Sequence, residues 1–584
     1  MAQRTVQDTH RPAPAGTGAR SRHALPRAAA CVAGAILLYF AFPPAGLWFL
    51  APPGVALLTL AVYRLPARRA AWLGYLGGAA FLLPALAWVR PIGVDAWLVL
   101  VAVESLFYAA MAAGAALVTR LRGWPVWVAA LWVLQESARG AFPLGGFPWV
   151  RVAFSQGDSA FTPYAALGGA PLVTFAAALS GTLLALAAVR LAPRRPPDAP
   201  SPRGDAPVPP GQAGPRWVAA GREALWWPPR VPAGGAPASP SRRRAAGLAC
   251  LLAGAVVVPL LGLAVPRPAP AVAGDRMVRI GVVQGDVPGE GLGFLGDQPA
   301  VVLRNHAGKT HELAAAVRAG RAARPDLVVW PENSTDIDPY RSEYARGVID
   351  AAVRDIGVPV LVGAVVRTPD GEHRHTRAIV WDPEGGPGAY YDKRKLVPFG
   401  EFVPFKELLE KFFSRVDLVG LQSLPGTRDG ALTMGPVTVG AISCYEVAFD
   451  GIVRSNVVAG GTPLVVQTNN ATYAHTGLPP QQLAMTRLRA VEHGRAVVAA
   501  ATTGISAYVD PAGELRWSTA EGVADMAVVE VPVRTGQTLA TRLGALPEWA
   551  LMLIGAGALA VALLRGRRAA PAAVRHDTTG EEDG

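Results

Sequence analysis

Cysteine is scarce in this chain, which has only three among its 584 residues. Cys31 and Cys250 fall within long hydrophobic stretches, so Cys444 has no partner in a soluble stretch with which to form an intrachain disulfide. A free cysteine is more often a small buried hydrophobe than a reactive group. Cys444, however, follows the apolar run 437–443 and stands two residues before Glu446. A lone thiol at a strand end near a carboxylate is therefore a candidate nucleophile.

Lysine is also rare, because the chain has five lysines and fifty arginines, and all five lie between Lys309 and Lys411. In a composition that favours arginine, a retained lysine indicates a role that arginine fills poorly. A compact ammonium can face a developing oxyanion, whereas a guanidinium is a wide planar fork. Lys393 and Lys395 both lie in the segment 391–395. Their spacing alone does not choose between them, and a surface position is the default for either.

Charge is sparse as well. Only 17% of the residues are charged and 51% are hydrophobic, which indicates a membrane protein rather than an ordinary soluble one. The apolar residues fall into eight blocks. Each is about as long as the roughly 20 residues that a helix needs to cross a bilayer. The blocks span residues 27–42, 44–63, 70–90, 96–118, 124–138, 165–189, 245–265 and 545–564. The sequence therefore predicts a multi-pass α-helical membrane bundle of about eight spans.

Arginine marks every second connection between these blocks. Arginine clusters precede the first and seventh blocks and follow the second, fourth, sixth and eighth. Because basic loops stay in the cytoplasm, both termini are predicted to be cytoplasmic and the stretch 275–540 to lie outside. The net charge of +12 is then mostly a property of the loops. We expect no nucleic-acid partner, since that would require basic residues clustered on a soluble face.

Composition divides the chain into seven parts. They are a cytoplasmic N-terminal tail (1–26), six spans (27–190), an insert (191–244), a seventh span (245–265), an extracytoplasmic domain (275–540), an eighth span (545–564) and a cytoplasmic tail (565–584). The insert is rich in Pro, Ala, Gly and Arg, so it lacks the residues to bury a core. It is predicted to be a disordered cytoplasmic loop.

Short apolar strands alternate with amphipathic helices within the stretch 275–540. We expect strands near 278–283, 327–330, 359–363, 377–382, 437–443, 463–468 and 496–502, and helices near 298–320, 341–356, 449–459 and 480–494. This alternation predicts an α/β layered domain whose functional groups lie in the loops at strand ends.

Three strand ends carry reactive groups. Glu332 comes after the strand 327–330 and Pro331, so its carboxylate projects from a hydrophobic sheet edge and suits a general base. The ordinary alternative is a carboxylate in the first turn of a helix. A cysteine nucleophile needs a base and a cation that holds an oxyanion, and Glu332, a lysine and Cys444 supply all three roles. The histidines of this stretch lack metal-ligand spacing, so we expect neither a metal nor another cofactor.

Three short motifs occur in one order along the chain: Trp330-Pro331-Glu332, Tyr391-Asp392-Lys393 and Cys444-Tyr445-Glu446. They resemble the Glu-Lys-Cys signature of the nitrilase superfamily. With the segment 396–401 after the lysine and the apolar blocks, the chain resembles the apolipoprotein N-acyltransferases, which are membrane-embedded members of that superfamily. The resemblance covers nearly the whole chain except the two tails and the insert. It includes Gly146-Phe147-Pro148-Trp149 and the segments 487–492 and 503–506.

The resemblance implies an αββα sandwich, the nitrilase-like fold, carried on a helical bundle. It implies that Glu332 is the general base, Lys393 the oxyanion stabiliser and Cys444 the nucleophile. Further residues implied to be needed for activity are Glu401, Tyr445 and Glu446. The implied substrate-binding residues are Phe147, Pro148, Trp149 and Phe294.

The chain departs from the family pattern in two loops. Asp286 stands where the family usually has asparagine, and Phe294 is the aromatic nearest to the place of a functional tryptophan. The loop 469–473 also lacks the tryptophan that is common there. Both loops are expected to contact substrate, so the departures bear on acyl-donor preference more than on the chemistry.

The function implied is acyl transfer at the outer face of the cytoplasmic (inner) membrane of a bacterium. Cys444 attacks a phospholipid acyl ester, and the thioester passes its acyl chain to the α-amino group of a diacylglyceryl-apolipoprotein, so the partners are the two lipid substrates and the bilayer. One alternative is a membrane-anchored nitrilase-type amidase, which hardly needs eight spans. Another is a transporter or scaffold with an inactive domain. Glu104 in the fourth block favours the transporter, although a helix–helix hydrogen bond explains it equally well.

Overall fold

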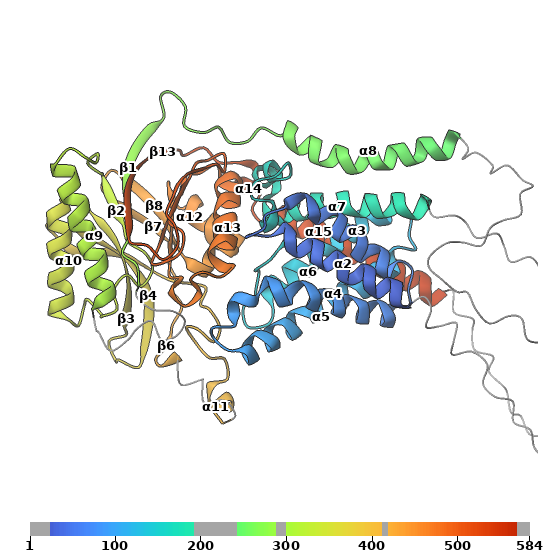
Figure 1. Ribbon diagram of the computed structural model, residues 1–584, viewed down its shortest axis with the longest axis horizontal. Coiled ribbons are helices and arrows are strands. Elements are labelled where there is room, and N and C mark those ends of the chain that lie inside the picture. The colour runs from blue at the N-terminus through green and yellow to red at the C-terminus, as the bar shows by residue number, and fades with distance from the viewer. Residues whose placement is uncertain (1–23, 192–241, 288–299, 412–418, 569–584) are drawn as a thin grey trace, which may run out of the picture.

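The computed structural model describes residues 24–191, 242–287, 300–411 and 419–568. A bundle of helices lies beside an α/β domain (Figure 1). Each of the eight predicted apolar blocks holds one helix of the bundle. These helices are α2 (Ala24–Ala41), α3 (Ala51–Val62), α4 (Ala67–Ala85), α5 (Val94–Val118), α6 (Trp124–Ala141), α7 (Ala165–Leu191), α8 (Arg242–Ala264) and α15 (Leu546–Arg568).

Membrane character is supported by the length and composition of these helices. Among the described residues, three stretches are long and apolar enough to cross a bilayer: Val94–Val118, Thr162–Leu191 and Leu546–Arg568. Shorter apolar stretches of 10–17 residues lie in α2, α3 and α8. A bundle of eight spans therefore remains a prediction.

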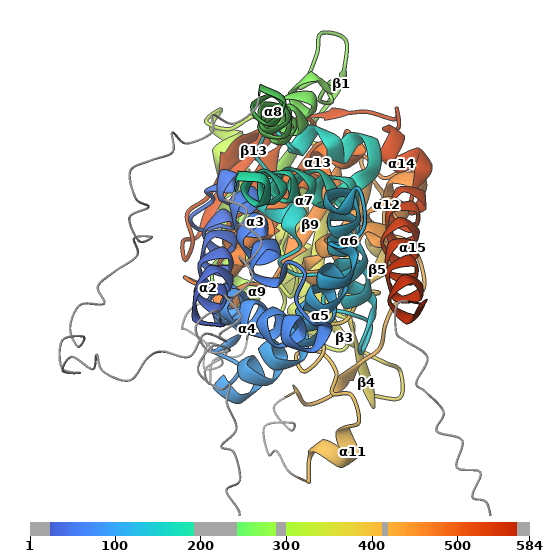
Figure 2. The same ribbon diagram turned by 90° about the vertical axis from the view of Figure 1, so that its right-hand side faces the viewer.

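Small residues let the helices of the bundle approach closely. A Cβ atom at Gly74 of α4 would lie 2.3 Å from the Cβ of Ala112 on α5. One at Gly181 of α7 would lie 2.4 Å from the carbonyl oxygen of Pro52 on α3. Such contacts are typical of helices packed by van der Waals attraction in a membrane. The helix α8 packs on α7 at the edge of the bundle, as both views show (Figures 1 and 2).

Two sheets form the centre of the α/β domain. The first has the strand order β13-β1-β2-β3-β4-β5, with β6 paired to β4, and the second has the order β12-β11-β10-β9-β8-β7. The first comprises β1 (Arg276–Gln284), β2 (Leu327–Val329), β3 (Val360–Arg367), β4 (His373–Asp382), β5 (Gly386–Asp392), β6 (Gln422–Ser423) and β13 (Asp525–Val533). The second comprises β7 (Ala431–Met434), β8 (Val437–Ser443), β9 (Leu464–Thr468), β10 (Val497–Ala501), β11 (Ala507–Val509) and β12 (Leu515–Ser518).

Helices cover the outer face of each sheet, which gives the predicted αββα layers. The helices are α9 (Val301–Arg318) and α10 (Glu343–Ile356) on the first sheet, and α12 (Asp450–Val458) and α13 (Leu478–His493) between the second sheet and the bundle (Figure 1). Two short helices, α11 (Lys406–Leu409) and α14 (Leu539–Leu543), complete the domain. Alternate residues of β8 face opposite layers: Val439 and Ala441 pack between the sheets, and Ile442 packs on the bundle side.

Parallel pairing brings the loops of the site to one edge of each sheet. In the first sheet β1, β2 and β3 run parallel, and in the second β8, β9 and β10 do. The predicted strands and helices all occur, with β2 ending at Val329, one residue before the predicted end. The sequence did not predict β5, β6, β7, β11, β12 or β13.

Candidate active site

Cys444 stands at a sharp turn between β8 and the short 3-10 helix η7 (Cys444–Ala448). Its backbone has φ +44°, a left-handed conformation that is costly for a residue with a side chain. A reciprocal capping arrangement holds the turn, in which Glu446 accepts a hydrogen bond from the backbone N–H of Ser443 at 2.9 Å. The turn leaves the thiol half-buried at the end of the strand.

Glu332 lies directly beyond the end of β2. The chain there passes so close to β3 that a Cβ at Gly363 would lie 2.0 Å from the carbonyl oxygen of Pro331. Glu332 is 5% exposed, and its Oε1 accepts hydrogen bonds from Lys393 Nζ, at 3.0 Å, and from the Ser443 hydroxyl. Its Oε2 accepts one from the backbone N–H of Asn469 at 3.2 Å. The carboxylate thus joins the loops after β2, β5, β8 and β9.

Lys393, rather than Lys395, is the lysine that faces this carboxylate. It follows β5, is 2% exposed, and its Nζ lies 2.9 Å from Oε2 of Glu401 as well as beside Glu332. Glu401 in turn accepts hydrogen bonds from the Thr376 hydroxyl and the backbone N–H of Val397, each at 2.8 Å. Lys395 instead places its Nζ 5.1 Å from the centre of an aromatic ring, that of Phe449.

Burial and charge together set the protonation states of the site. Burial, reinforced by the negative charge of Glu332, raises the pKa of the Cys444 thiol to about 12. Burial alone would lower the pKa of Lys393, but the carboxylates of Glu332 and Glu401 raise it well above its usual value. The resting site therefore holds a neutral thiol and a protonated amine.

Glu446 connects the segment 393–395 to the turn at Cys444 by hydrogen bonds. Its Oε1 accepts hydrogen bonds from the backbone N–H groups of Arg394 and Lys395, at 2.7 and 3.0 Å, and from the Tyr391 hydroxyl at 2.8 Å. Its Oε2 takes the backbone N–H of Ser443. These contacts fix Lys393 and Cys444 relative to each other, which is a positioning role.

The segment 146–149 that follows α6, called here the aromatic arm, reaches Tyr445, the residue after Cys444. The Tyr445 hydroxyl donates to the carbonyl of Gly146 at 3.0 Å, and its ring stacks on Trp149 and Phe147, with centroids 6.1 Å away in each case. Pro148 is buried and packs against Gly140. Of the predicted substrate-binding residues, Phe294 lies outside the described residues.

Glu104, the carboxylate that favoured a transporter, has a structural partner. It pairs with Arg139 at 3.3 Å, and both side chains are nearly inaccessible. Arg139 also donates to the carbonyl of Phe147 at 3.2 Å. The pair therefore holds the aromatic arm in place, which accounts for a charged residue within the bundle.

Sequence reasoning missed three residues of the site: Ser443, Asn469 and Gln482. The Gln482 amide nitrogen lies 3.7 Å from the Cys444 sulfur, and its oxygen accepts a hydrogen bond from the Asn470 side chain at 3.1 Å, which fixes the amide orientation. Gln482 is 5% exposed on a helix whose buried residues also include Gln481, Thr486 and Arg489, so no side-chain pattern in the sequence sets it apart.

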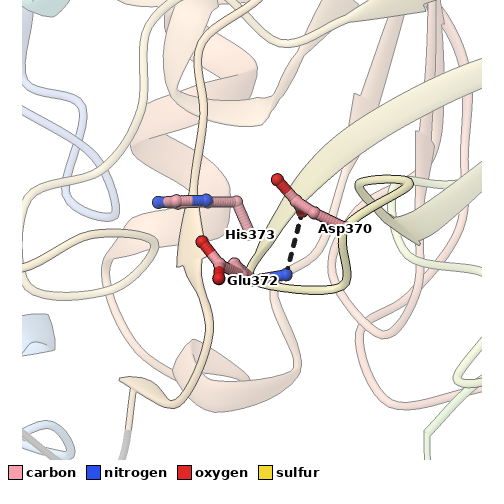
Figure 3. Close-up of side chains that lie close together, drawn as sticks. All are labelled: Asp370, Glu372 and His373. Carbon is pink, nitrogen blue, oxygen red and sulfur yellow. Dashed lines mark hydrogen bonds between the residues drawn. The ribbon is translucent and has the colours of Figure 1, made fainter.

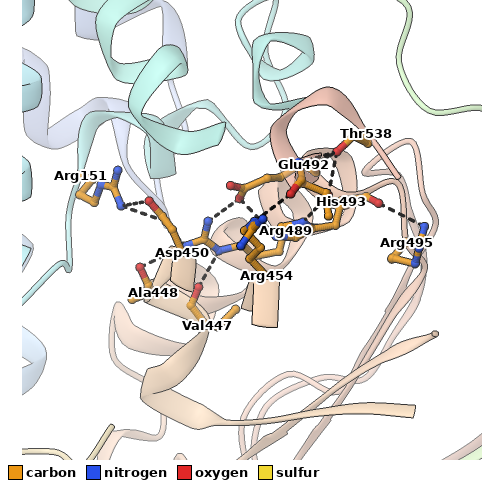
Figure 4. Close-up of polar contacts among 11 residues, drawn as sticks. Arg151, Val447, Ala448, Asp450, Arg454, Arg489, Glu492, His493, Arg495 and Thr538 are labelled. Atoms are coloured by element: carbon orange, nitrogen blue, oxygen red, sulfur yellow. Dashed lines mark hydrogen bonds and ion pairs between the residues drawn. The ribbon is translucent and has the colours of Figure 1, made fainter. Parts of the chain in front are cut away.

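A charged cluster of Arg151, Asp450 and Arg489 connects the bundle to the turn that begins at Cys444 (Figure 4). Arg151, from the loop after α6, donates to both carboxylate oxygens of Asp450 at 3.0 and 2.9 Å. Arg489 of α13 donates to Asp450 at 2.6 Å and to the carbonyls of Val447 and Ala448 at 2.8 and 3.0 Å. Those carbonyls end η7, so the cluster anchors the turn that begins at Cys444.

Asp370, Glu372 and His373 gather at the turn between β3 and β4 (Figure 3). Among the described residues they are the one grouping of three potential metal ligands. Asp370 accepts a hydrogen bond from the backbone N–H of Glu372 at 3.0 Å, as in an ordinary turn, and both carboxylates are exposed. We assign this group no metal.

Two family profiles match the chain. Residues 34–183 match the apolipoprotein N-acyltransferase N-terminal domain, and residues 298–540 match the carbon-nitrogen hydrolase family. Among solved structures, an amidase of the nitrilase superfamily from Nesterenkonia sp. AN1 is 21% identical. That match covers 46% of this chain and 95% of the amidase, with a TM-score of 0.34.

Two relatives that align with this chain over most of their length share the same description. An apolipoprotein N-acyltransferase from Mycolicibacterium smegmatis is 37% identical over 94% of this chain and 86% of its own length. Another from Gloeobacter violaceus is 31% identical over 94% of this chain and 96% of its own. These matches confirm the resemblance read from the motifs. The chain therefore belongs to the apolipoprotein N-acyltransferase family.

Proposed function

We propose that the protein transfers an acyl chain from a phospholipid to the α-amino group of the N-terminal diacylglyceryl-cysteine of apolipoproteins, through a thioester on Cys444. Family membership supports this function. The observation that carries the chemistry is the contact between Glu332 and the buried amine of Lys393, at 3.0 Å, at the strand end occupied by Cys444. Tyr445, the next residue, packs on the bundle and thereby joins the site to the part of the chain that meets lipid.

The first half-reaction begins with proton transfer. A carboxylate offers about four lone-pair positions, and Glu332 uses three of them for Lys393, Ser443 and Asn469, which leaves one for the thiol proton. The sulfur of Cys444 then attacks the ester carbonyl, and Lys393 stabilises the oxyanion. As the C–O bond breaks, Glu332 returns the proton to the leaving lysophospholipid.

In the second half-reaction the Cys444 sulfur, which was the attacking group, becomes the leaving group. The acceptor amine attacks the thioester carbonyl, and Lys393 again faces the oxyanion. Glu332 removes a proton from the amine, the C–S bond breaks, and the proton returns to the Cys444 sulfur. The products are an amide and the resting thiol, whose raised pKa favours its protonated form. Low water access at such a site protects the thioester from hydrolysis.

The proposal includes an orientation in the membrane. The stretch 275–540 lies at the outer face of the cytoplasmic membrane, with both termini in the cytoplasm and eight spans in between. The alternation of arginine-rich connections supports this arrangement.

Intact-mass measurement of the purified protein after incubation with phospholipid tests the function. We expect the mass of one acyl chain on the wild type and none on Cys444→Ala, while Cys31→Ala still forms the adduct. Glu332→Gln should slow adduct formation by about 10²–10⁴-fold, because the amide cannot act as a base.

Addition of a diacylglyceryl-cysteine peptide separates transfer from hydrolysis. The adduct should persist without acceptor and discharge when the peptide arrives, which yields an N-acylated peptide. Rapid decay of the adduct in water, with no product on the peptide, would favour the amidase alternative instead.

A further inference from the structure

The indole of Trp88 is a buried hydrogen-bond donor without a partner. Trp88 lies in the 3-10 turn η2 (Ala87–Val89) that follows α4, and 8% of the residue is exposed. Its Nε1 makes no hydrogen bond to any of the described residues. A buried tryptophan N–H usually has a partner, because an unsatisfied donor away from water is costly.

This donor belongs to a group of aromatic side chains beside the site, called here the aromatic wall: Trp88, Tyr473, Trp149, Phe147 and Tyr445. The Trp88 ring lies 5.4 Å from Tyr473, 5.5 Å from Trp149 and 6.4 Å from Phe147, measured between ring centres. Trp149 and Phe147 stack in turn on Tyr445, the residue after the nucleophile. The wall is therefore continuous from Cys444 to Trp88.

Tyr473 gives the wall a second connection to the catalytic groups. It ends the 3-10 turn η8 (Ala471–Tyr473), in the loop 469–473. The same loop begins with Asn469, whose backbone N–H binds Glu332. Trp88 thus faces, edge to face, an aromatic residue carried by the loop that holds the general base.

The chemistry of the wall selects the ligand of this donor. Aromatic faces suit acyl chains, and a single neutral N–H suits a neutral acceptor such as a carbonyl. A phosphate buried there would require a free cation. The charges of Arg139 and Arg151 are balanced by Glu104 and Asp450, so they leave no net positive charge for a phosphate, even though two nitrogens of each guanidinium lack a hydrogen-bond partner among the described residues.

We propose that the Trp88 N–H donates a hydrogen bond to the ester carbonyl of a non-reacting acyl chain on the diacylglycerol unit. This inference rests on the proposed function, and both substrates contain that unit. When one ester of a phospholipid reacts at Cys444, the second ester remains on the adjacent glycerol carbon. In the acceptor, both esters are spectators.

The test combines Trp88→Phe, which keeps an aromatic ring and removes the donor, with lipids in which one ester is replaced by an ether. Acylation of Cys444 is followed by intact mass, with rates normalised to the thiol that iodoacetamide alkylates. Both mono-ether isomers are used, since only the isomer that keeps the reactive ester forms an adduct. For the diacyl donor we expect Trp88→Phe to slow acylation about threefold to tenfold, the usual range for one neutral hydrogen bond. The ether donor should slow the wild type by a similar factor, and Trp88→Phe should then cost nothing more.

A second arm identifies which lipid uses the site. The preformed acyl-enzyme is discharged with diacylglyceryl-cysteine and dialkylglyceryl-cysteine peptides. A Trp88→Phe loss of rate that appears only with the ester lipid identifies the carbonyl. A loss in acylation assigns it to the donor, a loss in discharge assigns it to the acceptor, and a loss in both assigns it to both.

Trp97→Phe is the matched control. Its Nε1 also lacks a partner among the described residues, but Trp97 lies on α5 with Arg90 over its ring at 5.5 Å and shares none of the ring contacts that form the aromatic wall. It should leave both half-reactions unchanged. Equal losses for ester and ether lipids in Trp88→Phe, or no loss at all, would overturn the inference. Failure of the wild type to form any adduct would instead reject the proposed function.

Discussion

The two lysines of the segment 391–395 differ in what surrounds their amines. The Lys393 amine fits between two carboxylates at 3.0 and 2.9 Å and is almost inaccessible, so the wide guanidinium of Lys393→Arg should misplace the charge. We expect a loss of acylation rate of about 10²–10³-fold, as for removal of an oxyanion donor. Lys395→Arg preserves the cation over the Phe449 ring and should be nearly normal. Initial rates of adduct formation decide the matter, and equal losses in the two variants would contradict the assignment.

The raised pKa of Cys444 predicts its reactivity toward iodoacetamide. Only the thiolate reacts, and an ordinary cysteine has a pKa of about 8.5. With a pKa of about 12, the thiolate fraction should rise about tenfold per pH unit from pH 7 to pH 10. The alkylation rate of a variant with Cys444 as its single cysteine should therefore show no plateau in that window. A plateau below pH 9 would contradict the prediction.

Glu332→Gln should act in opposite directions on two reactions of the same sulfur. Removal of the negative charge removes one cause of the raised pKa, so alkylation near pH 8 should become faster. Acylation by phospholipid should become slower, because the base is lost. Parallel measurement of both rates on one preparation tests this, and a fall in both would mean that the variant has lost its structure.

At the scale of elements, Asp450 joins α12 to the bundle and to α13. Burial alone would raise the pKa of Asp450, but Arg151 and Arg489 hold it well below its usual range. A carboxyl group with a lowered folded-state pKa adds stability above its unfolded pKa of about 3.9, and loses it as the pH falls toward the folded value. The contact should therefore persist unchanged from neutral pH down to about pH 5.

Asp450→Ala leaves two buried guanidinium groups without their shared carboxylate. The Asp450 side chain is 26% exposed, and Arg151 and Arg489 keep Glu136 and Glu492 as second carboxylate partners. We therefore expect a fall of about 1–3 kcal/mol in the free energy of unfolding. Thermal unfolding in detergent measures it. The matched control is Asp158→Ala, which breaks a contact of 3.1 Å to Arg487, also on α13, but at a side chain that is 61% exposed. That change should cost less than about 1 kcal/mol, and similar losses in the two variants would refute a special role for the buried cluster.

In the second sheet, the strands that the sequence predicted are those built around apolar runs. Strands β8, β9 and β10 are largely buried on both faces and consist mostly of small and apolar residues. Strand β5 reads Gly-Pro-Gly at its start, which is typical of a turn, and it becomes a strand only through pairing with β4. Propensity along the chain does not reveal such long-range pairing.

The dependence on contacts between distant segments also explains which site residues the sequence did not predict. Motif order predicted Glu332, Lys393 and Cys444. Glu332 and Cys444 follow strands that the sequence predicted, whereas Lys393 follows β5, which it did not predict. Asn469 contributes a backbone N–H, which no side-chain pattern reveals. Gln482 depends on the packing of α13 against the turn at Cys444, a contact between distant segments.

For the whole molecule, topology is the property that the sequence predicts and that a fusion experiment can test. A reporter after residue 573 should be cytoplasmic, and one at Gly385, in the turn between β4 and β5, should lie outside. The reason is the placement of arginine in alternate connections. The opposite result at either point would reject the assignment of Cys444 to the outer face and would require an odd number of spans or a reversed bundle.

The hydrogen bond from Tyr445 to Gly146 has a consequence for how substrates travel. Tyr445, the residue after Cys444, is hydrogen-bonded to the aromatic arm, and that arm is closely packed, since a Cβ at Gly146 would lie 2.0 Å from the carbonyl oxygen of Gly140. A hinge motion that lifted the α/β domain off the bundle would break this hydrogen bond and separate the stacked aromatic rings beside Cys444. With the proposed function, we therefore expect the lipid substrates to enter and the products to leave along this contact, without separation of the domain from the bundle.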